Sequence, residues 1–379
     1  MSAPDPRATA LGALVAVAGG QGANAALAVA LHGAGLSARD RAFATELTYG
    51  TVRMRRACDW LSAPFLRRRL DDDVREAVRM GVHQLVHLGT PAHAAVSATV
   101  EIAPRRARGL VNAVLRRVAG RLGDGPVRWP DEATRLSYPD WIVDRLTADI
   151  GPQHAMAALE AMNVAQVVAV RPDGYRQGRA SQWVADEVEA ATGAVVVDLC
   201  AAPGGKATTI ADRAGLVVAA ELDPQRVVLL DDTVREHRPA GRIAIVRADA
   251  AQPPLALASV DSVLVDAPCT GLGALSRRPD ARWRVRPGDV DRLAGLQRRI
   301  LGAAADLLRP GGSLVYAVCT TTAAETTDVD RWLSQARPEL TAERPRSGLW
   351  RPWGRGGIVF PHDYGTDGMA VFRYRRIGA

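Results

Sequence analysis

Two of the four cysteines in this chain follow short apolar runs that are typical of buried strands. Cys269 comes after the run 260–265, and Cys319 comes directly after the run 314–318. A cysteine inside an apolar strand is usually a small core residue. The carboxyl end of a parallel strand, however, opens onto the ligand crevice of an α/β sheet. We therefore expect both thiols to share one crevice rim, where they can take part in chemistry.

A pair of thiols at such a rim suits one methyl-transfer reaction in particular. Carbon 5 of cytosine is a poor nucleophile, but a thiolate that adds to carbon 6 converts the ring to an enamine-like species. An acid near ring nitrogen 3 stabilises the adduct, and Asp266 ends the strand that precedes Cys269. Lys206 and a helix N-terminus can favour the thiolate form. These residues leave open which cysteine attacks.

A turn that contains two glycines follows the first apolar strand, which ends at Asp198. The turn consists of Cys200, Ala201, Ala202, Pro203, Gly204, Gly205 and Lys206, and a helix is expected after it. Glycines allow a tight turn and a close approach of the backbone to a ligand. Later strands end at or near three acids: Glu221, Asp249 and Asp266.

Such acids can accept ribose hydroxyls, and the chain has no phosphate-binding G-K-[ST] pattern. An acidic rim also suits a cationic sulfonium. These features predict an adenosine-containing cofactor without phosphate, namely S-adenosylmethionine. The alternative is that the acids only cap the helices that follow.

The surrounding sequence indicates the elements that position these residues. From about Val195, short β-branched runs alternate with helical segments, which is the pattern of a mainly parallel sheet with helices on both faces. The expected strands are 195–197, 217–220, 243–246, 260–265 and 314–318. The sequence therefore predicts an α/β fold of the doubly wound, Rossmann-like type.

The first part of the chain reads as helical instead. Apolar residues at helical spacing predict helices over 43–54, 74–86 and 110–118, and again within 138–163. The Gly/Pro-rich stretch 120–130 is expected to be a linker. We predict three regions: a helical domain over 1–122, bridging helices over 123–182, and the α/β domain over 183–379.

The balance of charge favours a polyanionic partner. Lysine and arginine outnumber aspartate and glutamate by 48 to 41, for a net charge of +7. Arginines gather at 105–108 and 116–117, where they form either an RNA-facing patch or a solvated helical face. Five more surround Trp283 between Gly271 and Pro287, in a loop that can clamp an RNA backbone and stack a flipped-out base, or that is simply solvated.

Other features bear on location and on metals. No cysteines form a C-x-x-C pair, so no zinc site and only free thiols are expected. The chain shows neither a signal segment nor an apolar run near the ~20 residues that span a bilayer. We expect a soluble, cytoplasmic, monomeric protein with no metal and no membrane partner.

The motifs resemble those of the Sun-type RNA cytosine methyltransferases, bacterial relatives of the nucleolar proliferation-antigen family. The resemblance lies in the run Asp198–Lys206, in Asp266-Ala267-Pro268-Cys269-Thr270-Gly271, in Ala317-Val318-Cys319-Thr320 and in Gly365-Thr366-Asp367-Gly368-Met369. It extends to the N-terminal region, where 39–47 and 109–117 look like the NusB-like, RNA-binding helical domain of these enzymes.

The resemblance implies a seven-stranded class I methyltransferase domain that acts on RNA, with ribosomal RNA, most of all 16S, as the expected substrate. It implies that Cys319 is the nucleophile and that Cys269 assists proton removal or product release. Cofactor contacts would come from 200–206, Glu221, Asp249 and Asp266.

Two departures from the family pattern stand out. The stretch between Asn163 and Ser181 is short where relatives carry a longer RNA-holding module, and Glu221 replaces the commoner aspartate. Two other functions therefore stay under consideration. One is a NusB-like RNA-binding adaptor with a decayed catalytic domain, and the other is a small-molecule methyltransferase.

Overall fold

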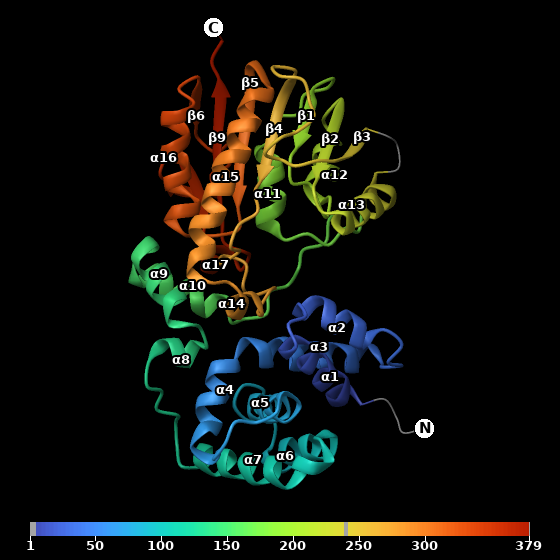
Figure 1. The fold of residues 1–379 in the computed structure, drawn as a ribbon, viewed down its shortest axis with the longest axis vertical. Coiled ribbons are helices and arrows are strands. Elements are labelled where there is room, and N and C mark those ends of the chain that lie inside the picture. The colour runs from blue at the N-terminus through green and yellow to red at the C-terminus, as the bar shows by residue number, and fades with distance from the viewer. Residues whose placement is uncertain (1–4, 239–241, 379) are drawn as a thin grey trace. The chain divides into compact units, whose positions relative to one another are not determined.

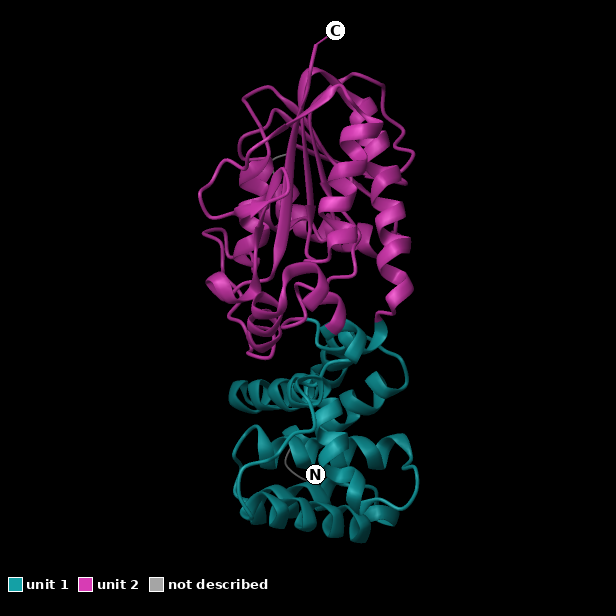
Figure 2. Ribbon diagram, turned by 90° about the vertical axis from the view of Figure 1, so that its left-hand side faces the viewer, with its two compact units in different colours: residues 1–143, 278–284 teal, residues 144–277, 285–379 magenta. Residues whose placement is uncertain are grey.

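The computed structural model describes residues 5–238 and 242–378, which fall into two compact units (Figure 2). One unit contains residues 1–143 together with 278–284, and the other contains 144–277 and 285–379. The short segment 278–284 thus belongs with the helical unit, although it comes from the middle of the α/β sequence. None of the helices in the described ranges combines the length and apolar character needed to cross a bilayer.

The first unit is built from helices around an apolar core. Its helices are α1 (Pro6–Ala18), α2 (Ala23–Leu31), α3 (Ala38–Arg53), α4 (Arg55–Ser62), α5 (Asp72–Val86), α6 (Ala92–Ile102), α7 (Arg108–Gly123), α8 (Glu132–Leu136) and α14 (Ala281–Arg284), and α9 (Asp140–Ile150) begins in it. Two short 3₁₀ turns cover Ala63–Phe65 and Arg105–Ala107. The expected helices are present, but α7 continues to Gly123, into the stretch predicted as a linker.

The periodicity of α5 explains how this core forms. Val74, Val78 and Val82 recur every four residues, so they lie on one face of the helix, and all three are buried. Val111, Leu115 and other apolar residues of α7 complete the same core. Asp72 and Asp73 lie in the first turn of α5, where their charges favour the helix start.

The second unit is an α/β layer structure (Figure 1). Its strands are β1 (Val195–Asp198), β2 (Leu216–Glu221), β3 (Ile243–Arg247), β4 (Val260–Asp266), β5 (Leu308–Val318), β6 (Leu340–Glu343), β7 (Arg351–Trp353), β8 (Gly356–Val359) and β9 (Met369–Arg376). Its remaining helices are α10 (Pro152–Ala161), α11 (Arg179–Glu187), α12 (Gly205–Ile210), α13 (Pro224–His237), α15 (Pro287–Leu307), α16 (Thr327–Ala336) and α17 (Pro361–Tyr364), with a 3₁₀ turn at Ala323–Glu325.

The described strands form one sheet in the order β3-β2-β1-β4-β5-β9-β8-β7, and β6 also pairs with β9. The first five in this order are parallel, while β9 runs antiparallel to β5 and leads to the antiparallel edge. The sheet has nine strands in the described residues rather than the seven expected. One half of β9 pairs with β6 and the other half pairs with β8, which in turn pairs with β7. The predicted α/β, Rossmann-like class is confirmed.

The order of strands reverses beside β1. From β1 the chain moves outward through α12, β2, α13 and β3, and it then returns to β4 and continues through α15 to β5. Because parallel crossovers are right-handed, α12 and α13 cover one face of the sheet and α15 covers the other. The carboxyl ends of β1 and β4 therefore flank the switch in strand order, where ligands bind in such sheets.

Candidate active site

The carboxyl ends of four adjacent strands bring the predicted acids and thiols together. In the order β2, β1, β4 and β5, these strands end at Glu221, Asp198, Asp266 and the residue before Cys319. Asp249 lies two residues beyond β3, is exposed, and accepts a hydrogen bond from the backbone of Ala251. The adjacency that the sequence predicted for Cys269 and Cys319 follows from the pairing of β4 with β5.

The thiols of Cys269 and Cys319 are in direct contact, with 3.3 Å between their Sγ atoms. The hydrogen bond with Cys319, together with burial, raises the pKa of Cys269 well above its ordinary value. The Cys269 thiol therefore stays protonated at neutral pH and can donate a hydrogen bond to the sulfur of Cys319. This arrangement suits a thiolate at Cys319 and a thiol at Cys269.

Lys206 lies beside these thiols and forms an ion pair with Asp266, with 2.6 Å between Nζ and Oδ2. Burial disfavours its charge, but Asp266, Asp198 and the Cys319 sulfur outweigh burial and raise the pKa of Lys206 above its usual value. The attraction is mutual, so the ammonium group stabilises negative charge on Cys319. Lys206 is therefore protonated at neutral pH and places a positive charge beside the thiols.

A buried carboxylate holds the two cysteine-bearing loops together, and the sequence did not indicate it. Glu325 accepts hydrogen bonds from the backbone N–H of Thr270 at 2.8 Å and from its hydroxyl at 2.6 Å. It also accepts from Thr322 at 2.9 Å and from Gln297, whose amide donates to the carbonyl of Pro268. Since Thr270 follows Cys269 and Thr322 lies three residues after Cys319, Glu325 fixes both loops.

The turn after β1 has the shape of a cofactor cradle. Gly204 adopts the left-handed conformation at a φ of 114°, which favours glycine. A Cβ at Gly205 would lie 2.6 Å from the ring of Tyr175, so a larger residue does not fit there. Gly205 is therefore required by the packing of Tyr175 against the turn, while Gly204 gives the turn its left-handed bend.

Two buried carboxylate oxygens at the strand ends fit a cationic adenosine cofactor. Within the described residues, Asp198 Oδ2 and Glu221 Oε2 accept no hydrogen bond, although Arg226 Nη2 lies 3.4 Å from the latter. Burial and the nearby charge of Asp266 raise the pKa of Asp198 to about 7. Orphaned acids of this kind can take ribose hydroxyls or positively charged groups.

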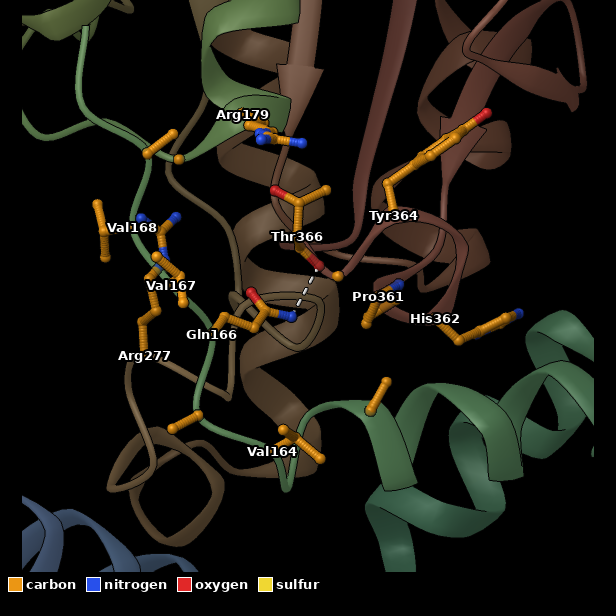
Figure 3. A pocket seen from close by; sticks show the side chains of 15 residues that line it. Val164, Gln166, Val167, Val168, Arg179, Arg277, Pro361, His362, Tyr364 and Thr366 are labelled. Carbon is orange, nitrogen blue, oxygen red and sulfur yellow. Dashed lines mark hydrogen bonds between the residues drawn. The ribbon is translucent and has the colours of Figure 1, made fainter.

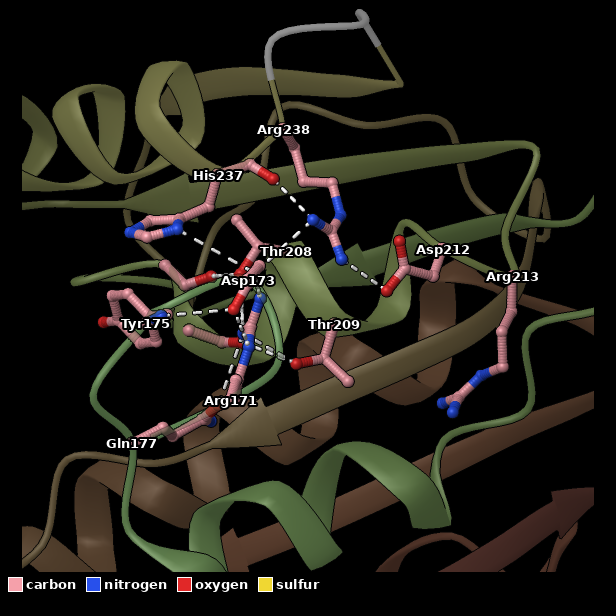
Figure 4. A network of polar contacts seen from close by, with 12 residues as sticks. Arg171, Asp173, Tyr175, Gln177, Thr208, Thr209, Asp212, Arg213, His237 and Arg238 are labelled. Atoms are coloured by element: carbon pink, nitrogen blue, oxygen red, sulfur yellow. Dashed lines mark hydrogen bonds and ion pairs between the residues drawn. The ribbon is translucent and has the colours of Figure 1, made fainter. Parts of the chain in front are cut away.

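The short segment before α11 packs on this cradle through a polar network (Figure 4). The buried guanidinium of Arg171 donates to the carbonyl of Gly205 at 2.7 Å and to the hydroxyls of Thr208 and Thr209. Arg171 also forms an ion pair with Asp173. The stretch that is shorter than the family pattern therefore still supports the glycine turn and α12.

Two residues of the arginine-rich loop, Arg282 and Trp283, do not have the role that the composition of the loop suggested. Arg282 is fully buried and lies over the ring of Tyr138, at 3.9 Å from the ring centroid. Trp283 packs against the helical core and donates from its indole N–H to the carbonyl of Val52 at 2.7 Å. The predicted base-stacking role of Trp283 is therefore wrong, because its ring belongs to the core of the first unit.

No group of three or more histidine, cysteine, aspartate or glutamate side chains with metal-binding geometry occurs in the residues that the structure describes. The four cysteines are free thiols, as predicted.

The doubly wound sheet, the glycine cradle and the acidic strand ends define an S-adenosylmethionine-dependent methyltransferase. Comparisons with known proteins agree with this class: the sequence profile of the 16S rRNA methyltransferase RsmB/F family matches residues 186–374, and that of the NusB family matches residues 4–120. The chain belongs to the RsmB/F family and carries a NusB-family domain, so the predicted Sun-type resemblance is confirmed.

Similar proteins extend over almost the whole chain. The ribosomal RNA small subunit methyltransferase B of Thermus thermophilus is 34% identical, and the match covers 100% of both chains. The protein of the same name from Xanthomonas campestris is 32% identical over 92% of each chain. The crystal structure of PH0851 shares the fold, with a TM-score of 0.79 at 20% identity over 97% of this chain and 98% of that one.

Proposed function

We propose that this protein methylates carbon 5 of a cytosine in 16S ribosomal RNA and that Cys319 is the nucleophile. The observation that carries the proposal is the contact between the Cys269 and Cys319 thiols beside the Lys206–Asp266 ion pair. A methyltransferase that acts on oxygen or on an exocyclic nitrogen needs no such thiol pair. The names of the similar proteins support ribosomal RNA as the substrate.

The first step forms a bond between Cys319 and the base. The Cys319 thiolate adds to carbon 6 of the cytosine, and the electrons of the carbon 5–carbon 6 double bond become available at carbon 5. Asp266, paired with Lys206, would lie at ring nitrogen 3 and stabilise the charge that develops there through the proton that it shares with Lys206. When bound, S-adenosylmethionine would supply the methyl group that bonds to carbon 5, and its sulfur would keep the electron pair of the broken sulfur–methyl bond; residues 200–206, Glu221, Asp249 and Asp266 would hold it.

The last step releases the product through Cys269. The electrons of the carbon 5–hydrogen bond reform the double bond, and the carbon 6–sulfur bond breaks with its pair going to Cys319. Cys269 gives its proton to the leaving sulfur of Cys319 and receives the proton from carbon 5. A single thiol in contact with Cys319 can therefore complete both proton transfers.

The other assignments complete the proposal. The NusB-family region, within residues 1–122, would bind RNA. Residues 183–379 would carry out the reaction, and residues 123–182 would connect these two domains. The protein would act in the cytoplasm as a monomer. The adaptor alternative is less well supported, because the thiols, the ion pair and the glycine cradle are all in place.

A direct assay tests this function. Purified protein is incubated with 16S rRNA and S-adenosylmethionine that carries a labelled methyl group, and the nucleosides are separated after digestion. We expect labelled 5-methylcytosine at one position or a few positions. Label in another nucleoside, or none in RNA with label in a small molecule, would overturn the proposal.

A further inference from the structure

A pocket of about 540 Å³ opens to solvent in the second unit (Figure 3). Its wall comes from the segment 164–169, from Arg179 at the start of α11, from Arg277 and from the segment 361–366. The volume lies within the range of pockets that bind small organic molecules. It is large enough for one nucleotide.

One side of the pocket exposes apolar side chains. Val167 is 93% exposed and Val164 is 65% exposed, although valine is normally among the most buried residues. Tyr364 also lines the pocket and is 46% exposed. Apolar and aromatic side chains on the wall of a pocket can pack against the rings of a ligand.

The same pocket carries positive charge and hydrogen-bonding groups. Arg179 is exposed and makes no ion pair with any residue in the described part of the chain, whereas Arg277 is paired with Asp367. The amide N–H of Gln166 donates to the carbonyl of Thr366 at 3.0 Å (Figure 3), and the amide oxygen of Gln166 is an acceptor that a ligand can use. Apolar and aromatic side chains next to an arginine are the groups that bind unstacked bases and their phosphates.

The pocket wall is connected to the loop of the proposed nucleophile. Thr366 lies two residues before Gly368, whose N–H donates to the carbonyl of Gly273 at 2.8 Å. The N–H of Gly273 in turn donates to the carbonyl of Cys319 at 3.0 Å. Two backbone hydrogen bonds thus join the segment that carries the pocket wall to the Cys319 loop, so the pocket adjoins the loop of the proposed nucleophile.

We propose that this pocket holds an unpaired nucleotide next to the target cytosine, an inference that rests on the proposed function. The base lies against Val164, Val167 and Tyr364, and its phosphate lies at Arg179. The pocket therefore selects RNA in which the target and its neighbour are both unstacked.

The test combines a protein variant with a change in the RNA. Val167→Glu puts a carboxylate into the pocket at an exposed position that the fold does not need, and Leu257→Glu adds the same charge at another exposed apolar residue as a matched control. The probe is a single-stranded fragment of 16S rRNA that the wild type binds and that contains one cytosine, together with copies that carry one abasic site at each position near that cytosine.

We expect Val167→Glu to raise both KM and the Kd for the intact fragment by about 10-fold, the effect of losing one stacked base, with kcat unchanged. Leu257→Glu should behave as the wild type. One abasic position beside the target should weaken binding to the wild type to a similar extent and have no further effect on Val167→Glu. Arg179→Ala should also weaken binding, and Arg179→Lys should largely restore it.

Three results would overturn the inference. The first is an unchanged Kd for Val167→Glu, and the second is an equal loss of RNA affinity in Leu257→Glu. The third is that, at every abasic position, the loss of affinity from the abasic site adds to the loss from Val167→Glu. If the two losses are additive and the wild type binds an apolar peptide, the pocket would serve a protein partner instead. Failure of the proposed function is distinguishable, because the wild type would then form no 5-methylcytosine, while the Kd measurements on the same fragments would still decide whether the pocket binds a nucleotide.

Discussion

The Sγ atoms of Cys269 and Cys319 lie 3.3 Å apart, although 50 residues separate them in the sequence. The contact arises because β4 and β5 are neighbours in the sheet and each thiol follows the end of its strand. Such closeness is what a two-thiol mechanism needs, since one sulfur must pass a proton to the other as the bond to the base breaks.

Removal of the Cys269 thiol should stall release of the product. Cys269→Ala lacks the group that protonates the leaving sulfur and removes the proton from carbon 5, so a covalent protein–RNA adduct should accumulate during turnover. The adduct is measured as a labelled band of reduced mobility on a denaturing gel. The double variant Cys269→Ala/Cys319→Ala should form no such band, and a band that persists in it would rule out Cys319 as the attachment point.

Loss of the Glu325 carboxylate should lower kcat without changing the affinity for the cofactor. Glu325→Gln keeps the shape of the side chain but removes one acceptor from the network around Thr270, so the Cys269 loop should lose its fixed position. We expect kcat to fall by about 10-fold, equivalent to one hydrogen bond to a charged group, with the Kd for S-adenosylmethionine unchanged. Equal losses in kcat and in cofactor affinity would indicate a general structural role instead.

The buried Asp198 should make stability depend on pH in an unusual direction. Its pKa is raised to about 7 in the folded protein, so the folded state binds more protons than the unfolded state between about pH 4 and pH 7. The stability it contributes is present at low pH and is lost as the pH rises through 7.

Relative to Asp198→Asn, the wild type should therefore lose up to about 4 kcal/mol of unfolding free energy between pH 4 and pH 8, a limit set by the shift in pKa. Urea unfolding of the cofactor-free proteins at several pH values measures this difference. A difference that stays constant over that range would show that Asp198 is ionised throughout.

The packing of Trp283 predicts a structural role for the arginine-rich segment. Trp283→Ala removes a ring from the core of the helical unit, so the free energy of unfolding should fall by about 2–4 kcal/mol, somewhat less than for a fully buried ring. The Kd for RNA should be unchanged at a temperature where the variant is folded. Arg278→Ala, at an exposed position of the same segment, should show the opposite pattern, with normal stability and weaker RNA binding.

The sequence was sufficient to predict which residues meet at the strand ends, because the strands have local signals. Continuous apolar runs identified β1 to β5, and the residues at their ends, such as Asp198 and Glu221, met at one edge as parallel pairing requires. The short strands β7 and β8 gave no such signal, since β8 begins with Gly356 and Gly357 and takes its place through pairing with β9. The expectation of seven strands failed at this edge.

Contacts between distant residues account for what the sequence did not predict. Glu325 follows a run of threonines and looks like a residue that starts a helix, and its role depends on Thr270, 55 residues earlier. Trp283 stands among arginines, as in an RNA-binding loop, yet it packs beside Val52, 231 residues away. Local composition cannot distinguish a solvated aromatic residue from one that fills the core of another unit.

The central claim is that Cys319 forms the bond to cytosine. Cys269→Ala protein is incubated with 16S rRNA and S-adenosylmethionine, the adduct is digested with nuclease and protease, and the peptides are analysed by mass spectrometry. We predict a methylated cytidine nucleotide attached to the peptide that contains Cys319. A nucleotide on any other residue, or full formation of 5-methylcytosine by Cys319→Ala, would contradict the assignment.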